Sequence, residues 1–279
     1  MSDIAAVVLA AGEGQRLRPL TLTVPKALCP VGNVPLLDRA LDRVEALGLP
    51  AAVNAAYLGE AVARHAEGRA HVSVEPDGPL GTGGGLARLR SWVDGRGVLL
   101  GNADAYLHDP DRDPGADIAA LIDGWDGTSV RMLGRPAADG RGEFGEHDFA
   151  GFSLIPWRYV ASLPDEKHEV VRSVWRPAER EGALTVVPYQ GTYLDTGTPS
   201  LYLAANLHAA AGTPLIAAGA AVAPGATVRN AVIGAGARVD GDVHDAVVWP
   251  GGRVHAGETL TAAIRVGDDL TVPAALPLA

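Results

Sequence analysis

The sequence of 279 residues is long enough to bury a large core, which excludes a small scaffold held together by disulfides. Its single cysteine, Cys29, has no internal partner, which favours a reducing cytoplasm. The formal net charge of −10, with dispersed Lys and Arg, opposes binding to nucleic acid or anionic lipid, and no apolar run is long enough to span a membrane. We therefore expect a cytoplasmic protein with neither of these partners, in which a local site attracts any anionic ligand.

Apolar runs and amphipathic segments alternate along most of the chain. Strands are expected at residues 4–9, 51–55, 71–75, 98–101, 129–133, 149–155 and 184–187. Helices are expected at residues 36–47, 60–67, 84–93, 170–180 and 199–210, with Thr198 capping the last and Gly212 ending it. Strands that alternate with helices predict an α/β fold, Rossmann-like, whose mostly parallel sheet carries helices on both faces.

The pattern of residues in the sequence changes after Gly212. Aliphatic residues recur every six positions, as in the series Val248, Val254, Leu260, Val266 and Val272. Ile216, Val222 and Val228 also follow this spacing, and so do Ile233 and Val239. Such a period predicts a short left-handed parallel β-helix of about three coils. We therefore expect a catalytic domain at residues 1–212 and a β-helix at residues 213–279, through which the protein could form a homo-oligomer.

The first expected strand runs into a glycine-rich loop. Gly12 and Gly14 allow backbone N–H groups to approach an anion closely, which indicates a phosphate site. The loop fits neither the dinucleotide fingerprint, because Leu17 replaces its third glycine, nor the Walker loop. Two cations follow, Arg16 and Lys26, and together they indicate phosphate chemistry rather than phosphate binding alone. The candidate nucleotide-binding residues here are Leu9, Ala10, Ala11, Gly12, Glu13, Gly14 and Gln15.

These residues resemble the signature of the sugar-1-phosphate nucleotidylyltransferases, also called NDP-sugar pyrophosphorylases. The pattern G-x-G-x-R-L-x-P-L-T, then P-K-x-L-x-P-V, is matched from Gly12 to Thr21 and from Pro25 to Val31. The resemblance implies that a nucleoside triphosphate and a sugar 1-phosphate react to give an NDP-sugar and pyrophosphate. It also implies that Arg16 and Lys26 are catalytic, with Lys26 contacting the sugar phosphate.

Three later segments carry the same resemblance. Glu75 and Pro76, followed by Leu80-Gly81-Thr82-Gly83-Gly84-Gly85, are similar to the family's base and ribose segment, especially the L-G-T-A-G-A-L form of mannose-1-phosphate guanylyltransferases. This implies nucleotide binding by Glu75, Pro76, Gly81, Thr82 and Gly83. The segment Gly101-Asn102-Ala103-Asp104 resembles N-G-D, and Tyr193-Leu194-Asp195-Thr196-Gly197-Thr198-Pro199 resembles W-x-D-x-G-T-P. They imply nucleotide binding by Asn102 and a Mg²⁺ ion on Asp104 and Asp195, whose hard oxygens suit this ion.

The sugar side of the pattern is less complete. The family's E-K-P segment has no clear counterpart, and residues 140–144 offer only a partial substitute. This stretch and residues 149–152 resemble the N-acetylmuramate-1-phosphate uridylyltransferases instead. Glu143 and Gly151 are the candidate sugar-phosphate residues there. We favour GTP and a mannose-like 1-phosphate, with UTP and an N-acetylmuramate or hexose 1-phosphate as the alternative.

Two other functions compete with this one. A non-catalytic subunit could sense a nucleotide or an NDP-sugar, but it would not need all four of Arg16, Lys26, Asp104 and Asp195. The tail could instead carry acyltransferase activity. No convincing catalytic context surrounds His244 or His255, so an oligomerisation role is favoured.

Overall fold

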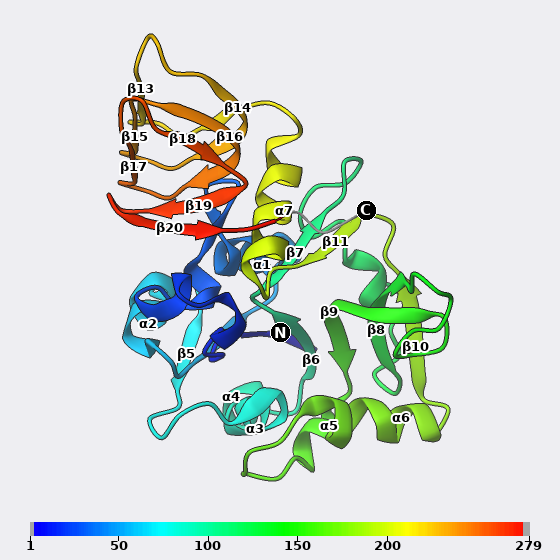
Figure 1. Cartoon of the computed structure of the whole chain (residues 1–279). Helices are drawn as coiled ribbons and strands as arrows, with labels where there is room; N and C mark the ends of the chain where they lie inside the picture. The colour runs from blue at the N-terminus through cyan, green and yellow to red at the C-terminus, as the bar shows by residue number, and fades with distance from the viewer. Residues whose placement is uncertain (1–2, 276–279) are drawn as a thin grey trace. The chain divides into compact units, whose positions relative to one another are not determined.

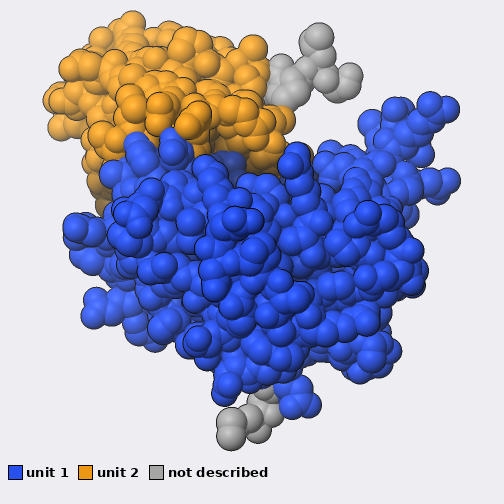
Figure 2. All heavy atoms as spheres, turned by 90° about the horizontal axis from the view of Figure 1, so that it is seen from below, with its two compact units in different colours: residues 1–13, 25–27, 37–193 blue, residues 14–24, 28–36, 194–279 orange. Residues whose placement is uncertain are grey.

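The computed structural model describes residues 3–275 (Figure 1). The chain forms two compact units, coloured separately in Figure 2. The first comprises Met1–Glu13, Pro25–Ala27 and Leu37–Tyr193, and the second comprises Gly14–Val24, Leu28–Leu36 and Leu194–Ala279. Each unit therefore combines segments from different parts of the sequence. The expected domain limit at residue 212 stays a prediction.

The first unit is built on a seven-stranded sheet with the order β10-β8-β9-β6-β1-β4-β5. Its strands are β1 (Ile4–Leu9), β4 (Ala51–Ala55), β5 (His71–Val74), β6 (Gly97–Asn102), β8 (Val130–Pro136), β9 (His147–Ile155) and β10 (Leu184–Pro188). β1 runs parallel to β4 and β6, and β4 runs parallel to β5. Only β9 is antiparallel to its neighbours within this sheet. The predicted mostly parallel α/β sheet is confirmed, and the continuous apolar run of β1 is explained by its central, buried place.

Helices of the first unit pack on this sheet. They are α1 (Leu36–Ala46), α2 (Gly59–Ala66), α3 (Gly81–Arg88), α4 (Arg90–Val93), α5 (Trp157–Ala161) and α6 (Arg176–Arg180), with the π-helical η5 (Val171–Trp175) and the 3₁₀ turn η4 (Ala119–Leu121). One core cluster joins Val7 and Leu100 of the sheet to Leu86 of α3. The helix expected at 84–93 begins earlier, at Gly81, and divides in two at Leu89. A separate two-stranded sheet joins β7 (Ala105–His108) to β11 (Thr192–Asp195), where the chain passes into the second unit.

The second unit contains one long helix, α7 (Pro199–Ala210). Thr198 caps it as expected, because its hydroxyl accepts a hydrogen bond from the backbone N of Leu201 at 3.3 Å. The helix ends at Ala211 in the left-handed conformation, and Gly212 follows with a positive φ of 78°. Short elements of this unit come from the N-terminal region: the 3₁₀ turns η1 (Gln15–Leu17) and η2 (Leu20–Leu22), and the hairpin of β2 (Pro30–Val31) and β3 (Val34–Pro35). Of the 3₁₀ turn η3 (Lys26–Leu28), the first two residues belong to the first unit.

The C-terminal strands form stacked parallel ladders compatible with the predicted β-helix. The strands are β12 (Leu215–Ile216), β13 (Ala221–Val222), β14 (Val228–Ile233), β15 (Arg238–Val239), β16 (Asp242–Val248), β17 (Arg253–Val254), β18 (Thr259–Thr261), β19 (Ala263–Val266) and β20 (Leu270–Pro273). Val228 lies opposite Val243, and Val243 lies opposite Leu260, so the chain returns beside itself after 15 and then 17 residues. β20 closes the stack by pairing antiparallel to β19.

Several of the hexad positions fill the core of these ladders, and others are only partly buried. Ile233, Val239, Val248 and Val254 are fully buried, as the six-residue spacing predicts. A β-helix of this period directs one aliphatic side chain per side into its core, and this expectation was wrong for Ile216, which is 46% exposed. Its strand, β12, has only two residues and pairs with one neighbour, β14, which gives it less cover than the later coils. Within residues 3–275, no helix is both long and apolar enough to cross a membrane.

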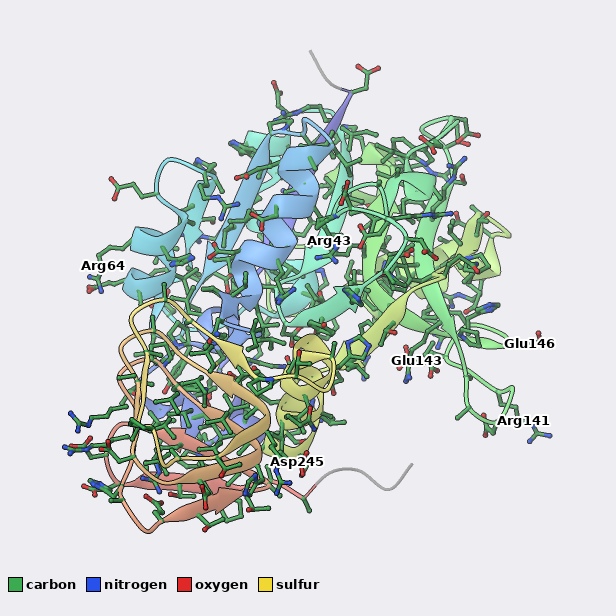
Figure 3. The ribbon with its side chains drawn as sticks, turned by 90° about the horizontal axis from the view of Figure 1, so that it is seen from above. Arg43, Arg64, Arg141, Glu143, Glu146 and Asp245 are labelled. Atoms are coloured by element: carbon green, nitrogen blue, oxygen red, sulfur yellow. The ribbon has the colours of Figure 1, made fainter. Side chains whose placement is uncertain are left out.

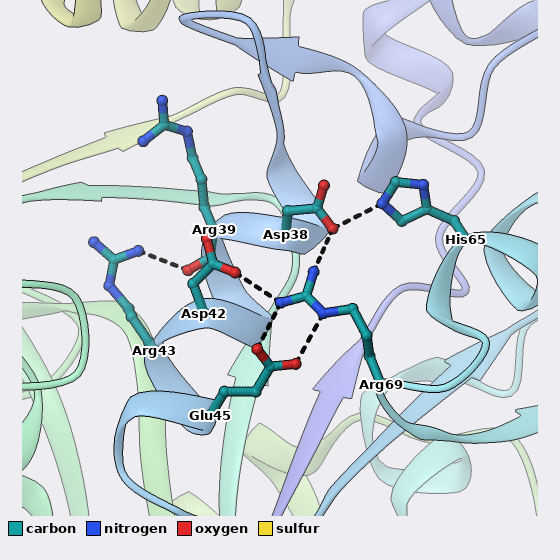
Figure 4. A network of polar contacts seen from close by, with 7 residues as sticks. All are labelled: Asp38, Arg39, Asp42, Arg43, Glu45, His65 and Arg69. Carbon is teal, nitrogen blue, oxygen red and sulfur yellow. Dashed lines mark hydrogen bonds and ion pairs between the residues drawn. The ribbon is translucent and has the colours of Figure 1, made fainter.

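A polar network joins α1 to the region after α2 (Figure 4). The guanidinium of Arg69 contacts three carboxylates of α1: Asp38 at 2.7 Å, Asp42 at 2.7 Å and Glu45 at 2.8 Å. His65 also reaches Asp38, at 2.7 Å. The hydrogen bond from Arg69 lowers the pKa of the Glu45 carboxyl, so the folded chain keeps this group ionised to lower pH than the unfolded chain does.

Replacing Arg69 by Met is expected to lower the melting temperature at pH 7, with a loss of roughly 1 kcal/mol because the pairs are partly exposed. A carboxyl with a lowered folded pKa contributes stability above its unfolded pKa of about 4.3, and that stability is lost as the pH falls through the folded pKa. The difference between variant and wild type should therefore shrink at pH 3. Arg64→Met, at an exposed pair with Glu60, is the control. Equal differences at both pH values in thermal unfolding would contradict this account.

Candidate active site

A pocket of about 350 Å³ opens in the first unit at the carboxyl ends of its central parallel strands. Residues 9–12 begin at the last residue of β1, Asn54 lies in β4, and residues 102–104 begin at the last residue of β6. Ligands of open α/β sheets bind at this edge, because loops from several strands converge there. The lining residues are Leu9, Ala10, Ala11, Gly12, Lys26, Ala27, Asn54, Pro79, Gly81, Thr82, Asn102, Ala103, Asp104, Lys167 and Glu169.

The glycine-rich loop forms one wall of this pocket. The backbone N of Ala10 donates to Oδ1 of Asn54 at 2.8 Å, which fixes the start of the loop on β4. A side chain added at Gly12 would meet no atom within 4 Å, so the backbone there is open to a ligand. Gly14 adopts a left-handed φ of 60°, and its carbonyl accepts a hydrogen bond from Thr21 Oγ1 at 2.8 Å.

Lys26 and Asp104 form a close ion pair in the pocket. Nζ of Lys26 lies 2.6 Å from Oδ2 of Asp104, and the lysine side chain is only 11% exposed whereas the aspartate is 42% exposed. The sequence motifs gave these two residues separate roles, and the contact between them was not predicted. A shielded lysine ammonium held in one position near the end of β6 can attract an anionic ligand more strongly than one surrounded by water.

A second pair of predicted residues lies together within the second unit. Nη2 of Arg16 is 3.9 Å from Oδ2 of Asp195, and their side chains are 70% and 40% exposed. Gly197 keeps this contact open, because a Cβ there would lie 2.6 Å from Arg16 and 3.0 Å from Asp195. Each predicted metal carboxylate is thus next to a predicted catalytic cation.

The connection between α5 and η5 lies against the start of α3. We call residues 165–170 the strap. The backbone N atoms of Gly83 and Gly84 both donate to the carbonyl of His168, at 3.0 and 3.3 Å. A Cβ at Gly83 would lie 2.3 Å from the His168 ring, so this approach requires glycine. The first turn of α3 is therefore already capped by the strap, which takes up amides that a ligand could otherwise use.

Thr82 completes the attachment of the strap. Its hydroxyl donates to Oε2 of Glu169 at 2.6 Å and accepts from the backbone N of Val170 at 2.8 Å. Its backbone N also donates to Glu169 Oε2, at 3.2 Å. One threonine side chain therefore holds the strap through both of its hydrogen-bonding functions.

Two residues of the strap, Lys167 and Glu169, line the pocket and were missed in the sequence analysis. A compositional signal could have identified the lysine. Lys26 and Lys167 are the only lysines of the sequence, in which the other basic residues are all arginine. Both lysines line the same pocket, and a lysine ammonium is a compact point charge that binds phosphate well.

The structure brings many of the predicted residues together, but not all. Those that line the pocket are Leu9, Ala10, Ala11, Gly12, Lys26, Gly81, Thr82, Asn102 and Asp104. Other predicted residues of the first unit are not among the lining residues: Glu13, Glu75, Pro76, Gly83, Glu143 and Gly151. Glu75 is only 2% exposed, and its oxygens bond to protein groups.

The candidate sugar residues lie on and after the connection between β8 and β9. Figure 3 shows Glu143 there, with Arg141 and Glu146 pointing away from the ribbon. The backbone of Glu143 is anchored at both ends, since its N donates to Asp148 and its carbonyl accepts from Arg176. Gly151 has a φ of 84°, and a Cβ there would lie 2.6 Å from that of Ala105. A side chain at this position would therefore clash with β7.

Each of the two aspartates, taken separately, carries the kind of donor group that a magnesium ion prefers. Asp104 and Asp195 offer hard carboxylate oxygens on partly exposed side chains, which leaves room for the waters that Mg²⁺ retains. Within residues 3–275 there is no cluster of three or more His, Cys, Asp or Glu side chains able to enclose a metal. A magnesium site completed by substrate phosphates does not require such a cluster.

The sequence is similar to those of known nucleotidyltransferases. Residues 6–132 match the family of MobA-like NTP transferase domains. The chain is 30% identical, over 91% of its length and 82% of the relative, to a mannose-1-phosphate guanylyltransferase of Mycobacterium tuberculosis. It is 29% identical, over 72% of its length and 95% of the relative, to an N-acetylmuramate alpha-1-phosphate uridylyltransferase of Caulobacter vibrioides.

A solved structure shares the fold along almost the whole chain. A Thermus thermophilus protein described as a mannose-1-phosphate geranyltransferase superposes with a TM-score of 0.67 and 19% identity, covering 98% of this chain and 95% of that one. At this identity the likeness concerns the fold alone. It extends through the C-terminal ladders, which are compatible with the predicted β-helix, and it agrees with the predicted α/β sheet.

The strap offers a direct test of the Thr82 contacts. A protease specific for lysine can cut this sequence only after Lys26 and Lys167. Thr82→Val keeps the shape of the side chain but removes both hydroxyl hydrogen bonds, so cleavage after Lys167 should become about five-fold faster or more. Thr185→Val, at an exposed position of β10, is the matched control. Unchanged cleavage of the Thr82 variant would show that the hydroxyl does not hold the strap.

Proposed function

We propose a substrate pair for this chain, which belongs to the sugar-1-phosphate nucleotidylyltransferase family: GTP and a mannose-like 1-phosphate. The observation that carries the proposal is the match over 91% of the chain to a relative named as a mannose-1-phosphate guanylyltransferase. The products would be pyrophosphate and a GDP-linked sugar. The enzyme class itself follows from the family, whereas the base and the sugar are our inference.

A UTP-dependent enzyme is the second candidate. The uridylyltransferase relative matches less of this chain, 72%, although its identity of 29% is almost the same. The Gly-Arg-Gly-Glu-Phe stretch at residues 140–144 also resembles that group. We favour GTP because the guanylyltransferase match also extends further along the chain.

The charge distribution supports the roles proposed for the cations. In a chain of net charge −10, a polyanionic substrate needs local cations, and Lys26 and Lys167 both line the pocket. A sugar phosphate has a second pKa near 6 and is largely dianionic at pH 7, so the attacking oxygen needs no general base. Lys26 would align this dianion, and Arg16 would stabilise the triphosphate charge. Positioning and charge stabilisation then account for the catalysis.

The metal belongs to the same proposal. Enzymes of this family generally use a divalent metal ion, and the carboxylates of Asp104 and Asp195 would hold it here as Mg²⁺. Bound there, the ion would neutralise charge on the triphosphate. The Asp104 carboxylate, which lies 2.6 Å from Nζ of Lys26, would then be shared between the lysine and the metal ion. The roles of Arg16 and Asp195 rest on the sequence motifs.

The tail is proposed to act outside the reaction. We place the domain limit at residues 212 and 213, where α7 has ended and β12 has not begun. The ladders that follow would serve oligomerisation rather than acyl transfer.

The substrate proposal is tested by pyrophosphate release from each nucleoside triphosphate against a panel of sugar 1-phosphates with Mg²⁺. GTP with mannose 1-phosphate should give the highest kcat/KM, by about ten-fold or more over UTP pairs, because a pocket that hydrogen-bonds one base leaves groups unpaired with another. Strict dependence on UTP would overturn the proposed base. Failure of every pair would favour a sensing subunit without activity.

The metal assignment is tested by replacing each carboxylate. Asp104→Ala and Asp195→Ala should each lower kcat by roughly 100-fold or more, since each removes a metal ligand. Both side chains are about 40% exposed, so the melting temperature should change little. Asp139→Ala, on the exposed connection between β8 and β9, is the control. Activity retained in either variant at saturating Mg²⁺ would sink the assignment of that carboxylate.

A further inference from the structure

A chain of buried hydrogen bonds joins the glycine-rich loop to the segment before α3. The backbone N of Ala10 donates to Oδ1 of Asn54, and Nδ2 of Asn54 donates to Oε1 of Glu75, both at 2.8 Å. The other oxygen of Glu75, Oε2, accepts from the backbone N of Leu80, also at 2.8 Å. Asn54 and Glu75 are each only 2% exposed. We call these four groups the relay.

We infer that Asn54 and Glu75 are positioning residues, which set the phosphate-binding loop and the base segment relative to each other without Glu75 touching the nucleotide. The relay links Ala10, on one wall of the pocket, to Leu80, which directly precedes the lining residues Gly81 and Thr82. The inference rests on the proposed nucleotide site in this pocket. It does not depend on which base is bound.

The polarity of the relay allows only one arrangement. Ala10 and Leu80 both offer N–H donors at its two ends, so the groups between them must begin and end with acceptors. The amide of Asn54 supplies an acceptor toward Ala10 and a donor toward Glu75. The carboxylate of Glu75 supplies two acceptors. Both acceptor oxygens of Glu75 are used within the protein, which leaves the side chain poorly suited to contact a base.

Close packing shows that the relay has no spare space. A Cβ at Gly85 would lie 2.5 Å from Nδ2 of Asn54 and 3.0 Å from Oε1 of Glu75. Helix α3 can pack against the relay only because position 85 is glycine. Any larger residue there would push the side chains of Asn54 and Glu75 apart. Buried polar groups held this tightly cost much when one partner is lost.

The inference is tested with a polarity swap. Asn54→Asp alone places two carboxylates against each other. Glu75→Gln alone turns an amide NH₂ toward a donor, either Asn54 or the N–H of Leu80. In the double variant, the new carboxylate at position 54 would accept from Ala10 and from the new amide at position 75, whose oxygen would accept from Leu80. Every hydrogen bond is restored, with side chains of the same size.

Each single variant should raise the KM and the dissociation constant for the triphosphate by about ten-fold or more, with a smaller change in kcat and in the KM for the sugar phosphate. The double variant should recover to within about three-fold of the wild type. Glu67→Gln, exposed at the end of α2, is the matched control and should not differ from wild type. Binding is measured by titration without turnover, using the nucleotide that the wild type prefers.

The outcomes separate positioning from contact. If Glu75 touches the nucleotide directly, the double variant stays as weak as Glu75→Gln, which overturns the inference. A double variant that does not fold also overturns it, because the swap should preserve the packing. If Asn54→Asp alone fails to fold, a folded and active double variant still supports the relay. If the wild type prefers UTP, the proposed base is wrong but this test still applies. If the wild type binds no triphosphate, both the proposed function and this inference are refuted.

Discussion

The hydrogen bond from the backbone of Ala10 to Asn54 is the constraint on which the pocket depends. It ties the glycine-rich loop after β1 to β4, and through Glu75 to the segment that leads into α3. A loop of small residues has little packing of its own to fix its conformation. Such a loop binds an anion well only if its N–H groups are already oriented, because the cost of ordering is then met by the fold rather than by the ligand.

Electrostatics adds direction to this preorganised backbone. The chain carries a net charge of −10, so the cations that meet a phosphate must be local. Lys26 is held in place by its contact with Asp104 at 2.6 Å, and the strap brings Lys167 to the same pocket. A lysine already paired with a carboxylate loses little side-chain entropy on binding a phosphate, whereas an exposed lysine such as Lys167 has more to lose. The two lysines therefore differ in preorganisation although they line one pocket.

Much of the fold follows from local patterns. The apolar run of β1, the amphipathic α1 and the caps of α7 are determined by neighbouring residues, and their predicted positions are correct within a residue or so. The place of Asn102 and Asp104 at the carboxyl edge of the sheet also follows from the pattern, because the loops after parallel strands meet at one edge.

Features that depend on long-range contacts could not be predicted in the same way. The strap meets α3 across more than 80 residues, and nothing local in residues 165–170 indicates this partner. Glu75 was expected to bind nucleotide because it lies in a motif, but its burial depends on Asn54, 21 residues away. The exposure of Ile216 likewise reflects its place at the end of a stack, where the six-residue period still holds but no further coil covers it.

The most direct measurement is a crystal structure of the wild-type protein with GTP and Mg²⁺. Our account predicts triphosphate oxygens within hydrogen-bonding distance of the backbone N–H groups of residues 11–12, with Lys26 beside them and the hydrogen bonds among Ala10, Asn54, Glu75 and Leu80 unchanged. A nucleotide bound away from this pocket, or a base contacted directly by the Glu75 carboxylate, would contradict it.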